Sequence, residues 1–274
     1  GLFEPTATAE LIGKVMNVSK EETDSALQEL VQRGLLNERE KQTVGYYQLH
    51  DLAYSYARTT FTSKGLSYQP VIIACRDFAL EHANDLSYLD VEISNVLEAA
   101  ETAFINQDVQ LLIDIVNALT VEGSYFAARG HTIHTLELLR SAIDCAEAIG
   151  ATETAHYLWS KLGNTYADFL GQLDLALDAY QKALQFAREM GDSRRKAILL
   201  TVIGTVHFRQ GTGDSDQYHQ QAESIAREQD DAIVLAQILS NRGVQALDKD
   251  SLDFDAAKGR DLSAEAATIA EKHD

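Results

Sequence analysis

Apolar residues recur along most of the chain at the three- and four-residue spacing of helices that bury one face. The clearest stretch is residues 158–192, LWSKLGNTYADFLGQLDLALDAYQKALQFAREMGD. Two helices are predicted here, with a break at Gly171. The positions that share their apolar faces are Leu162, Gly163 and Tyr166 in the first helix, and Ala176, Tyr180, Ala183 and Leu184 in the second. The stretch therefore predicts a pair of packed helices.

The same skeleton recurs about every forty residues. The glycines of the first helices are spaced by 40, 41 and 39 residues: Gly123, Gly163, Gly204 and Gly243. The alanines of the second helices are spaced by 41, 39 and 42 residues: Ala142, Ala183, Ala222 and Ala264. Small residues let partner helices approach closely, and stacking buries faces that a single pair would expose. Residues 111–274 are therefore expected to form about four stacked helix pairs.

Residues 6–60 do not follow this period. A short apolar helix is expected up to Met16, and Ser19 with Glu22 forms a capping box that opens a second helix, which ends at Gly34. The side chains expected to face inward from the second helix are Leu27, Leu30 and Val31. The following LLNEREKQTVGYYQLH predicts two strands around the charged turn EREKQT. Two helices and a two-stranded wing are the order of elements in a winged-helix domain.

The predicted fold class is therefore all-α with a small two-stranded wing. We expect a winged helix over residues 1–60, connecting helices over 61–110, and a right-handed α-α superhelix over 111–274.

The charge of the chain changes the expectation for its partners. The formal net charge is -19, of which residues 1–60 contribute six Lys/Arg and nine Asp/Glu, a balance of -3. Nucleic-acid binding draws on a clustered basic footprint. The outward side of the second helix instead carries Glu21, Glu22 and Asp24. Nucleic acid is therefore not expected as a partner, although a DNA-binding transcription regulator stays open as an alternative.

Two cysteines, Cys75 and Cys145, lie seventy residues apart, without the dense spacing of a disulfide scaffold, so we expect two buried, reduced thiols. The longest aliphatic run, VIIA at 71–74, is too short to span a bilayer. No charged-then-apolar leader opens the chain, so no membrane and a cytoplasmic location are expected. The start GLFEP, without methionine, suggests a fragment of a longer protein.

The forty-residue unit resembles the tetratricopeptide repeat. The matching features are Leu-Gly, an aromatic residue three positions later, a turn glycine, and then Ala, aromatic and Ala at spacings of 4 and 3, which are clearest from Trp159 to Asp192. The unit from Ser193 departs from the pattern, with His207 and His219 where aromatic residues are usual. Upstream, Glu92 and Asn95 resemble the helix that leads into such repeats in large bacterial signalling proteins.

The junction carries a second resemblance. A winged helix that ends in Leu49-His50-Asp51, followed by a helix and superhelical repeats, resembles the end of the nucleotide-binding module of NB-ARC ATPases, a branch of the STAND signalling proteins. In that family the histidine of a Met-His-Asp motif contacts the β-phosphate of ADP. The resemblance implies that His50 and Asp51 sense the nucleotide, with Leu49 in place of methionine. A purely structural His-Asp pair stays open.

The chain itself is not expected to be an enzyme. It has no G-x-x-x-x-G-K-[ST] loop, because its one Gly-Lys pair, Gly13-Lys14, is followed by Val15 inside a helical pattern. No cofactor is therefore expected in this chain, and ADP or ATP is expected in the full-length parent. No metal is expected either, since His131 and His134 are interpreted as a solvated helix start. Asp214 and Asp216 are interpreted as part of a turn.

The resemblance to tetratricopeptide proteins implies a ligand groove lined by the first helix of each pair. Positions counted from the packing glycines give Tyr157, Asn164, Asp168, Thr201, Thr205, Arg209 and Gln237. The expected partners are a protein or peptide inducer and an upstream nucleotide-binding domain of the same polypeptide. The expected function is sensing and relay inside a STAND ATPase. A free-standing adaptor, and a groove that only packs against the ATPase body, are the remaining alternatives.

Overall fold

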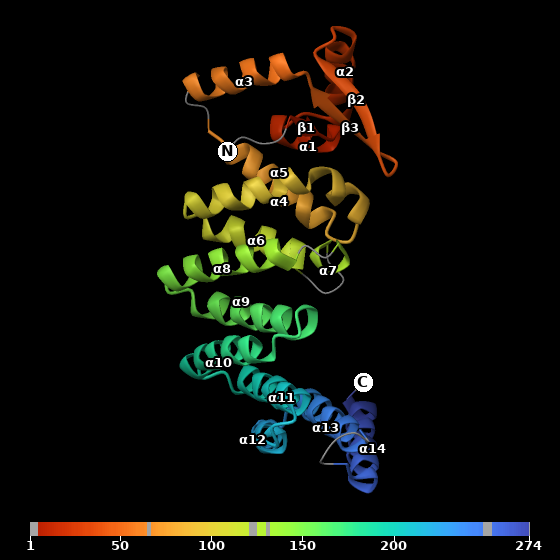
Figure 1. Cartoon of the computed structure of the whole chain (residues 1–274), viewed down its shortest axis with the longest axis vertical. Helices are drawn as coiled ribbons and strands as arrows, with labels where there is room; N and C mark the ends of the chain where they lie inside the picture. The colour runs from red at the N-terminus through yellow and green to blue at the C-terminus, as the bar shows by residue number, and fades with distance from the viewer. Residues whose placement is uncertain (1–4, 65–66, 121–124, 130–131, 249–253, 274) are drawn as a thin grey trace. The chain divides into compact units, whose positions relative to one another are not determined.

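The computed structural model describes residues 5–64, 67–120, 125–129, 132–248 and 254–273 (Figure 1). The chain divides into two compact units, Gly1–Cys145 (unit 1) and Ala146–Asp274 (unit 2). Each unit is built mainly from helices, and unit 1 also contains a small sheet. Within the described part of the chain, no helix is both long and apolar enough to cross a membrane.

Unit 1 begins with a three-stranded antiparallel sheet in the order β1-β3-β2, where a two-stranded wing was predicted. Its elements, in chain order, are β1 (Thr6–Ala7), α1 (Ala9–Met16), α2 (Lys20–Gln32), β2 (Leu36–Lys41) and β3 (Val44–Leu49). The additional strand, β1, contributes only two residues, which pair with Gln48 and Tyr47. The predicted capping box is confirmed, because the Ser19 hydroxyl caps Glu22 N while the Glu22 carboxylate accepts from Ser19 N.

The hairpin is tighter than the sequence predicted. The stretch Glu38–Lys41, expected in the turn, continues β2, and the turn consists of Gln42 and Thr43. Both residues have positive φ, 49° and 70°. A two-residue turn with positive φ at both positions matches the right-handed twist of the strands it joins.

The small core of this part consists of Leu27, Leu36 and Tyr47, with Ala9, Ile12, Val31 and Leu49 packed against it. The prediction that Leu30 faces inward is wrong, because it is 37% exposed. Met16, at the end of α1, is 64% exposed. Both residues lie in the last turn of their helices.

The rest of unit 1 is helical: α3 (Asp51–Lys64), α4 (Gln69–Glu81), α5 (Leu86–Ile105), α6 (Val109–Thr120), α7 (Tyr125–Arg129) and α8 (Thr132–Ala148), which continues into unit 2. The domain boundaries expected at residues 60 and 110 fall inside α3 and α6. Cys75 is free and buried in α4, and burial raises the pKa of its thiol, which makes it a packing residue. Cys145 is also free and buried.

Buried Glu92 joins β1 to α5. Its carboxylate accepts hydrogen bonds from Thr8 N and, at 2.7 Å, from Asn95 Nδ2. Asn95 Nδ2 also donates to Thr6 O at 2.8 Å. Burial raises the pKa of Glu92, and these hydrogen bonds oppose that shift. The two polar residues therefore fasten the first strand to the helical part of unit 1.

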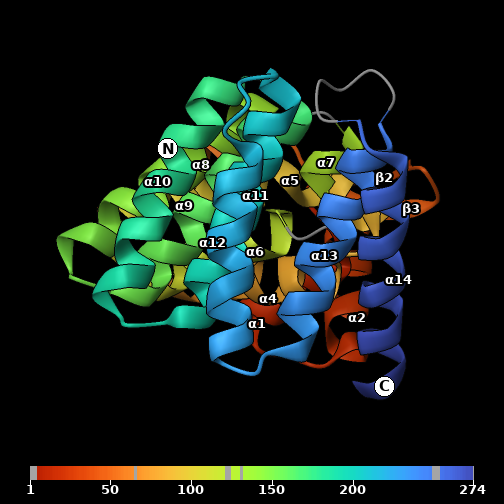
Figure 2. The ribbon, with the colours of Figure 1, turned by 90° about the horizontal axis from the view of Figure 1, so that it is seen from below.

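The described residues of unit 2 form three helix pairs. The first is α9 (Thr152–Asn164), extended by the π-helix η1 (Thr165–Phe169), with α10 (Leu173–Glu189); the others are α11 (Ser193–Gln210) with α12 (Ser215–Glu228), and α13 (Ala232–Leu247) with α14 (Ala256–His273). Figure 2 shows α13 and α14 side by side.

The packing role predicted for the repeat glycines is confirmed at three positions. A Cβ added to Gly163 would lie 2.5 Å from the Tyr180 ring, and one at Gly204 would lie 2.8 Å from the His219 ring. At Gly243 an added Cβ would lie 2.5 Å from Ser263 Oγ. Each glycine therefore lets the two helices of its own pair approach closely. Gly123, the glycine of the first unit, lies outside the described residues.

The alanine of the fourth unit was assigned to the wrong residue. Ala142, Ala183 and Ala222 are fully buried, as expected, but Ala264 is exposed and Ala266 is buried instead. The fourth unit lacks the turn glycine, and its second helix begins only at Ala256. The buried face of α14 is therefore displaced by two residues from the position that the period predicts.

Candidate functional site

The end of β3 places His50 at a fixed point of the backbone. Leu49 pairs with Leu36 across the sheet, and His50 N donates to Leu35 O at 3.1 Å. His50 O then accepts from Tyr54 N at 2.8 Å, which begins α3. The histidine is thus held on one side by the hairpin and on the other by the first turn of a helix.

Among the described residues, one ring nitrogen of His50 has a hydrogen-bond partner, and the other, Nε2, has none. Its Nδ1 accepts from Leu52 N at 3.4 Å, so in the neutral ring the proton resides on Nε2. Both His50 and Asp51 are exposed. The Asp51 carboxylate lies in the first turn of α3, where the helix dipole favours a negative charge. An exposed Nε2–H is a suitable donor to an anionic oxygen.

Large apolar side chains are exposed around His50. Leu35, which bonds to the His50 backbone, is 42% exposed, while Leu52 and Tyr56, one helical turn apart on α3, are 77% and 75% exposed. Leu30, whose carbonyl accepts from Leu35 N, adds to this surface. We call Leu30, Leu35, Leu52 and Tyr56 the His50 patch. Apolar surface gathered around polar groups is typical of a surface covered by a partner or another domain.

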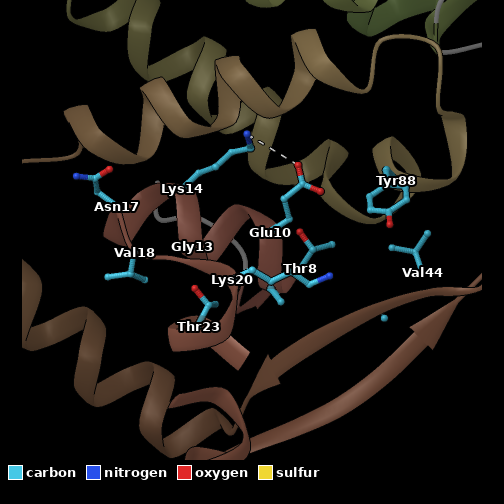
Figure 3. Close-up of a pocket in the computed structure, with 12 residues that line it drawn as sticks. Thr8, Glu10, Gly13, Lys14, Asn17, Val18, Lys20, Thr23, Val44 and Tyr88 are labelled. Carbon is cyan, nitrogen blue, oxygen red and sulfur yellow. Dashed lines mark ion pairs between the residues drawn. The ribbon is translucent and has the colours of Figure 1, made fainter. Parts of the chain in front are cut away.

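Unit 1 also has a cavity of about 600 Å³ between α1, the start of α2, the hairpin and Tyr88 of α5 (Figure 3). Lys14 and Glu10 on its wall are engaged with α4. Lys14 Nζ lies 2.7 Å from a Glu81 carboxylate oxygen, and Glu10 Oε1 lies 2.9 Å from His82 Nε2.

Glu10, Glu81 and His82 bring their ligand atoms within 4.8 Å of one another, a spacing that a metal ion could use. The Lys14 ammonium already supplies the positive charge between the two carboxylates, at 2.7 Å from Glu81 and 3.9 Å from Glu10. The His82 ring is stacked on Tyr88 at 4.5 Å. We interpret this group as a structural contact between α1 and α4.

The second candidate site is the predicted groove of unit 2, beginning on α9. Tyr157 is 37% exposed, with Lys161 Nζ 5.5 Å above its ring centre. Asn164 is exposed, and its Oδ1 accepts from the Tyr180 hydroxyl at 2.7 Å. This bond fixes the amide so that its NH₂ group remains for a ligand. Burial raises the pKa of Tyr180, with a contribution from Asp168, so the phenol stays a donor.

Asp168 and Arg209 come together from neighbouring helix pairs. Arg209 Nη1 lies 3.2 Å from Asp168 Oδ1, and Nη2 donates to Ala167 O at 2.7 Å. Ala167 and Asp168 lie in the π-helix η1, and single turns of π-helix within α-helices are frequent at functional sites. Two residues predicted only from repeat spacing thus form one charged contact.

The remaining groove residues do not all face outward. The assignment of Thr201 is corrected, because its side chain is 3% exposed and its hydroxyl donates to Ala197 O at 2.9 Å. Thr205 is half-buried, with its hydroxyl bonded to Thr201 O, and Gln237 is exposed. Sequence reasoning missed Val244, 65% exposed, although it follows Gly243 as Asn164 follows Gly163.

The other candidates of the sequence occupy ordinary positions. His134 is exposed on α8, and His131 lies outside the described residues. Asp214 is the residue before α12. Asp216 lies in the first turn of α12, where it pairs with Arg242 at 3.0 Å, so it belongs to a helix and not to a turn.

Comparisons with known proteins identify the class of fold. No family model and no curated protein matches the chain. Among solved structures, BtubC (BKLC) from P. vanneervenii is similar with a TM-score of 0.54 and 17% identity, over 80% of this chain and 90% of that chain. A putative kinesin light chain of Podosopora anserina with nearly identical TPR-like repeats has a TM-score of 0.51 and 12% identity, over 76% and 98%.

A third structure is a STAND protein with a tetratricopeptide repeat sensor from Pyrococcus horikoshii. It has a TM-score of 0.32 and 15% identity, over 96% of this chain and 48% of that chain, a value too low to compare folds. The first two matches, together with the helix pairs of unit 2, show that the chain has a TPR-like repeat fold. The predicted fold class is confirmed in this respect.

Proposed function

We propose that this chain is the sensor and relay region of a STAND signal-transduction ATPase. In this proposal the repeats bind a protein or peptide inducer, and the first part of unit 1, acting as a winged helix, couples inducer binding to the nucleotide state of an upstream domain. The observation that carries the proposal is His50, whose free Nε2 is exposed at a fixed strand end within an apolar patch. The exposed side chains of Leu35 and Leu52 add apolar surface beside it, which is typical of a face covered by a partner or another domain.

The order of elements supports a winged helix that does not read DNA. The outward face of α2 exposes Glu21, Glu22 and Gln28. The two glutamates repel phosphate, and Gln28 has no positive charge to attract it. This acidic face of α2 is better suited to contact another domain of the same polypeptide than to contact DNA. The coupling would be a population shift, in which the inducer favours an open form over an ADP-bound closed form.

The first prediction concerns His50. In the expected full-length protein, His50→Ala removes one hydrogen bond to an anionic oxygen, worth about 1.5 to 3 kcal/mol, so ADP release should be roughly 10 to 150 times faster. The release rate is measured by displacing a fluorescent ADP analogue. The exposed His134 on α8 offers the control, and His134→Ala should release ADP at the wild-type rate.

A structural role for His50 has a different signature. If the pair only stabilises the start of α3, His50→Ala lowers the melting temperature of the 274-residue chain and leaves ADP release unchanged. The proposal expects the opposite pattern, because the His50 side chain makes one long hydrogen bond within unit 1.

A second prediction places the inducer in the groove of unit 2. Tyr157→Ala combined with Arg209→Ala removes an aromatic anchor and an arginine, the residue types that dominate binding energy at interfaces. An array of extended basic peptides, chosen because the chain is acidic, identifies a ligand whose affinity is then measured by fluorescence polarisation. The double variant should bind at least about tenfold more weakly.

The matched control is Lys182→Ala with Arg188→Ala, two exposed residues on α10, the second helix of the same pair. This control should keep wild-type affinity. Equal affinity of the wild type and the groove variant would place the ligand elsewhere. The melting temperature of both variants is recorded, because Arg209 also bonds Ala167 O.

A further inference from the structure

His219 is buried in the second helix pair of unit 2, where the preceding pair has Tyr180. It is 0% exposed, and its ring packs against the backbone of α11 at Gly204. Its Nδ1 lies 2.9 Å from Ser215 O. A carbonyl oxygen only accepts, so Nδ1 carries the proton and the ring is neutral with Nε2 unprotonated.

The second ring nitrogen is closely packed and makes no hydrogen bond that meets the usual geometry. Nε2 is buried and has no hydrogen-bond partner among the described residues. It faces the helix backbone, since a Cβ built on Gly204 would lie 3.1 Å from it. Protonation would therefore add a charge to the protein interior, and the new N–H would have only the Thr201 backbone as a potential acceptor, outside hydrogen-bonding geometry in the packed ring.

The surroundings also disfavour the imidazolium. Burial lowers the pKa of His219, and Arg242 on α13 adds to this effect. The hydrogen bonds to the backbone of Ser215 and Thr201 and the charge of Asp216 on α12 oppose it. Arg242 is itself paired with Asp216 at 3.0 Å, so that carboxylate is already engaged with a cation.

Loss of this packing would extend beyond one helix pair. Ser215 Oγ lies 3.3 Å from His219 Nδ1 and donates to Gln245 Oε1 of α13 at 3.0 Å. Gln245 Nε2 in turn donates to Thr205 Oγ1 of α11 at 3.4 Å. A chain of polar contacts thus joins the buried ring to α12, α13 and α11.

We propose that His219 is an acid-sensitive element that loosens the packing of α12 on α11 when it takes up a proton. The unfolded or opened ring has an ordinary pKa near 6.5, and the folded ring has a lower one. The open state therefore binds more protons, so stability is complete above the ordinary value and falls as pH drops below it. The population of the open state should rise up to about tenfold per pH unit between the two values.

The test follows hydrogen exchange of the full chain from about pH 7.5 to about pH 5.0, corrected for intrinsic exchange rates. Peptides from α11 and α12 should lose protection with falling pH in the wild type, and this dependence should disappear in His219→Gln. His134→Gln, at an exposed position, should behave like the wild type.

An independent measurement uses the wild type alone and decides even if His219→Gln does not fold. The NMR titration of the His219 imidazole should have a midpoint below the ordinary histidine value of about 6.5. A midpoint at or above that value would overturn the proposal. An equal loss of protection in the wild type and in folded His219→Gln would overturn it as well.

Discussion

Gly163→Ala is expected to lower the free energy of unfolding of unit 2 by about 2 kcal/mol, because an overpacking cost of about 3 kcal/mol exceeds the roughly 1 kcal/mol that alanine gains over glycine in a helix. The added Cβ would lie 2.5 Å from the Tyr180 ring, which is 2% exposed and held by its bond to Asn164. The buried ring would have to shift to accept the added methyl group.

The measurement is urea unfolding followed by the fluorescence of Trp159, the one tryptophan of the chain, which lies on α9. The control is Gln181→Ala, an exposed position on the facing helix α10, which should change stability by less than about 0.5 kcal/mol. If Gly163→Ala is as stable as this control, the close approach of the two helices at Gly163 is not what the repeat glycines provide.

Arg242→Ala is expected to lower the free energy of unfolding by about 2 to 3 kcal/mol. This loss is at or below the lower end of the range for removing one partner of a buried ion pair. The arginine side chain is only 11% exposed and bridges Asp216, at 3.0 Å, and Glu223. Without Arg242, the Glu223 side chain, which is 19% exposed, loses one of its two cationic partners. Glu223 retains its ion pair with Arg227 at 2.8 Å. The loss is at the low end of the range because Asp216 is 43% exposed and water screens its charge.

Arg188→Ala, at an exposed position on α10, supplies the control and should change stability by less than about 0.5 kcal/mol. Both variants are compared by urea unfolding with the same tryptophan signal. A loss below 1 kcal/mol for Arg242→Ala would mean that the charged network of α12 and α13 is loosely solvated and contributes little.

Local signals predicted much of the fold. The packing glycines and the capping box of α2 were found because each is encoded within a few residues or within a repeat. The short strand β1 was missed because two residues carry no periodicity, and its position depends on Glu92 and Asn95, more than eighty residues away. The hairpin turn was missed because Gln42-Thr43 lacks the Asn-Gly signature of such turns.

The residues of the candidate groove were chosen from the repeat spacing alone. Asp168 and Arg209 lie at the same offset from their packing glycines, and the structure pairs them, a contact that the counting did not predict. The same counting placed Thr201 in the groove, although that face of α11 is covered at this point. The buried contacts of His219 and Arg242 join residues from different helices, and no spacing rule within one repeat reveals them.

The most direct test of the proposed function is the nucleotide content of the full-length protein. The protein is purified, heated to release bound ligands, and the supernatant is analysed by ion-pair chromatography. The account predicts about one ADP per polypeptide, and none for residues 1–274 alone, which lack a phosphate-binding loop. A full-length protein that carries no nucleotide and encodes no such loop upstream of Gly1 would contradict it.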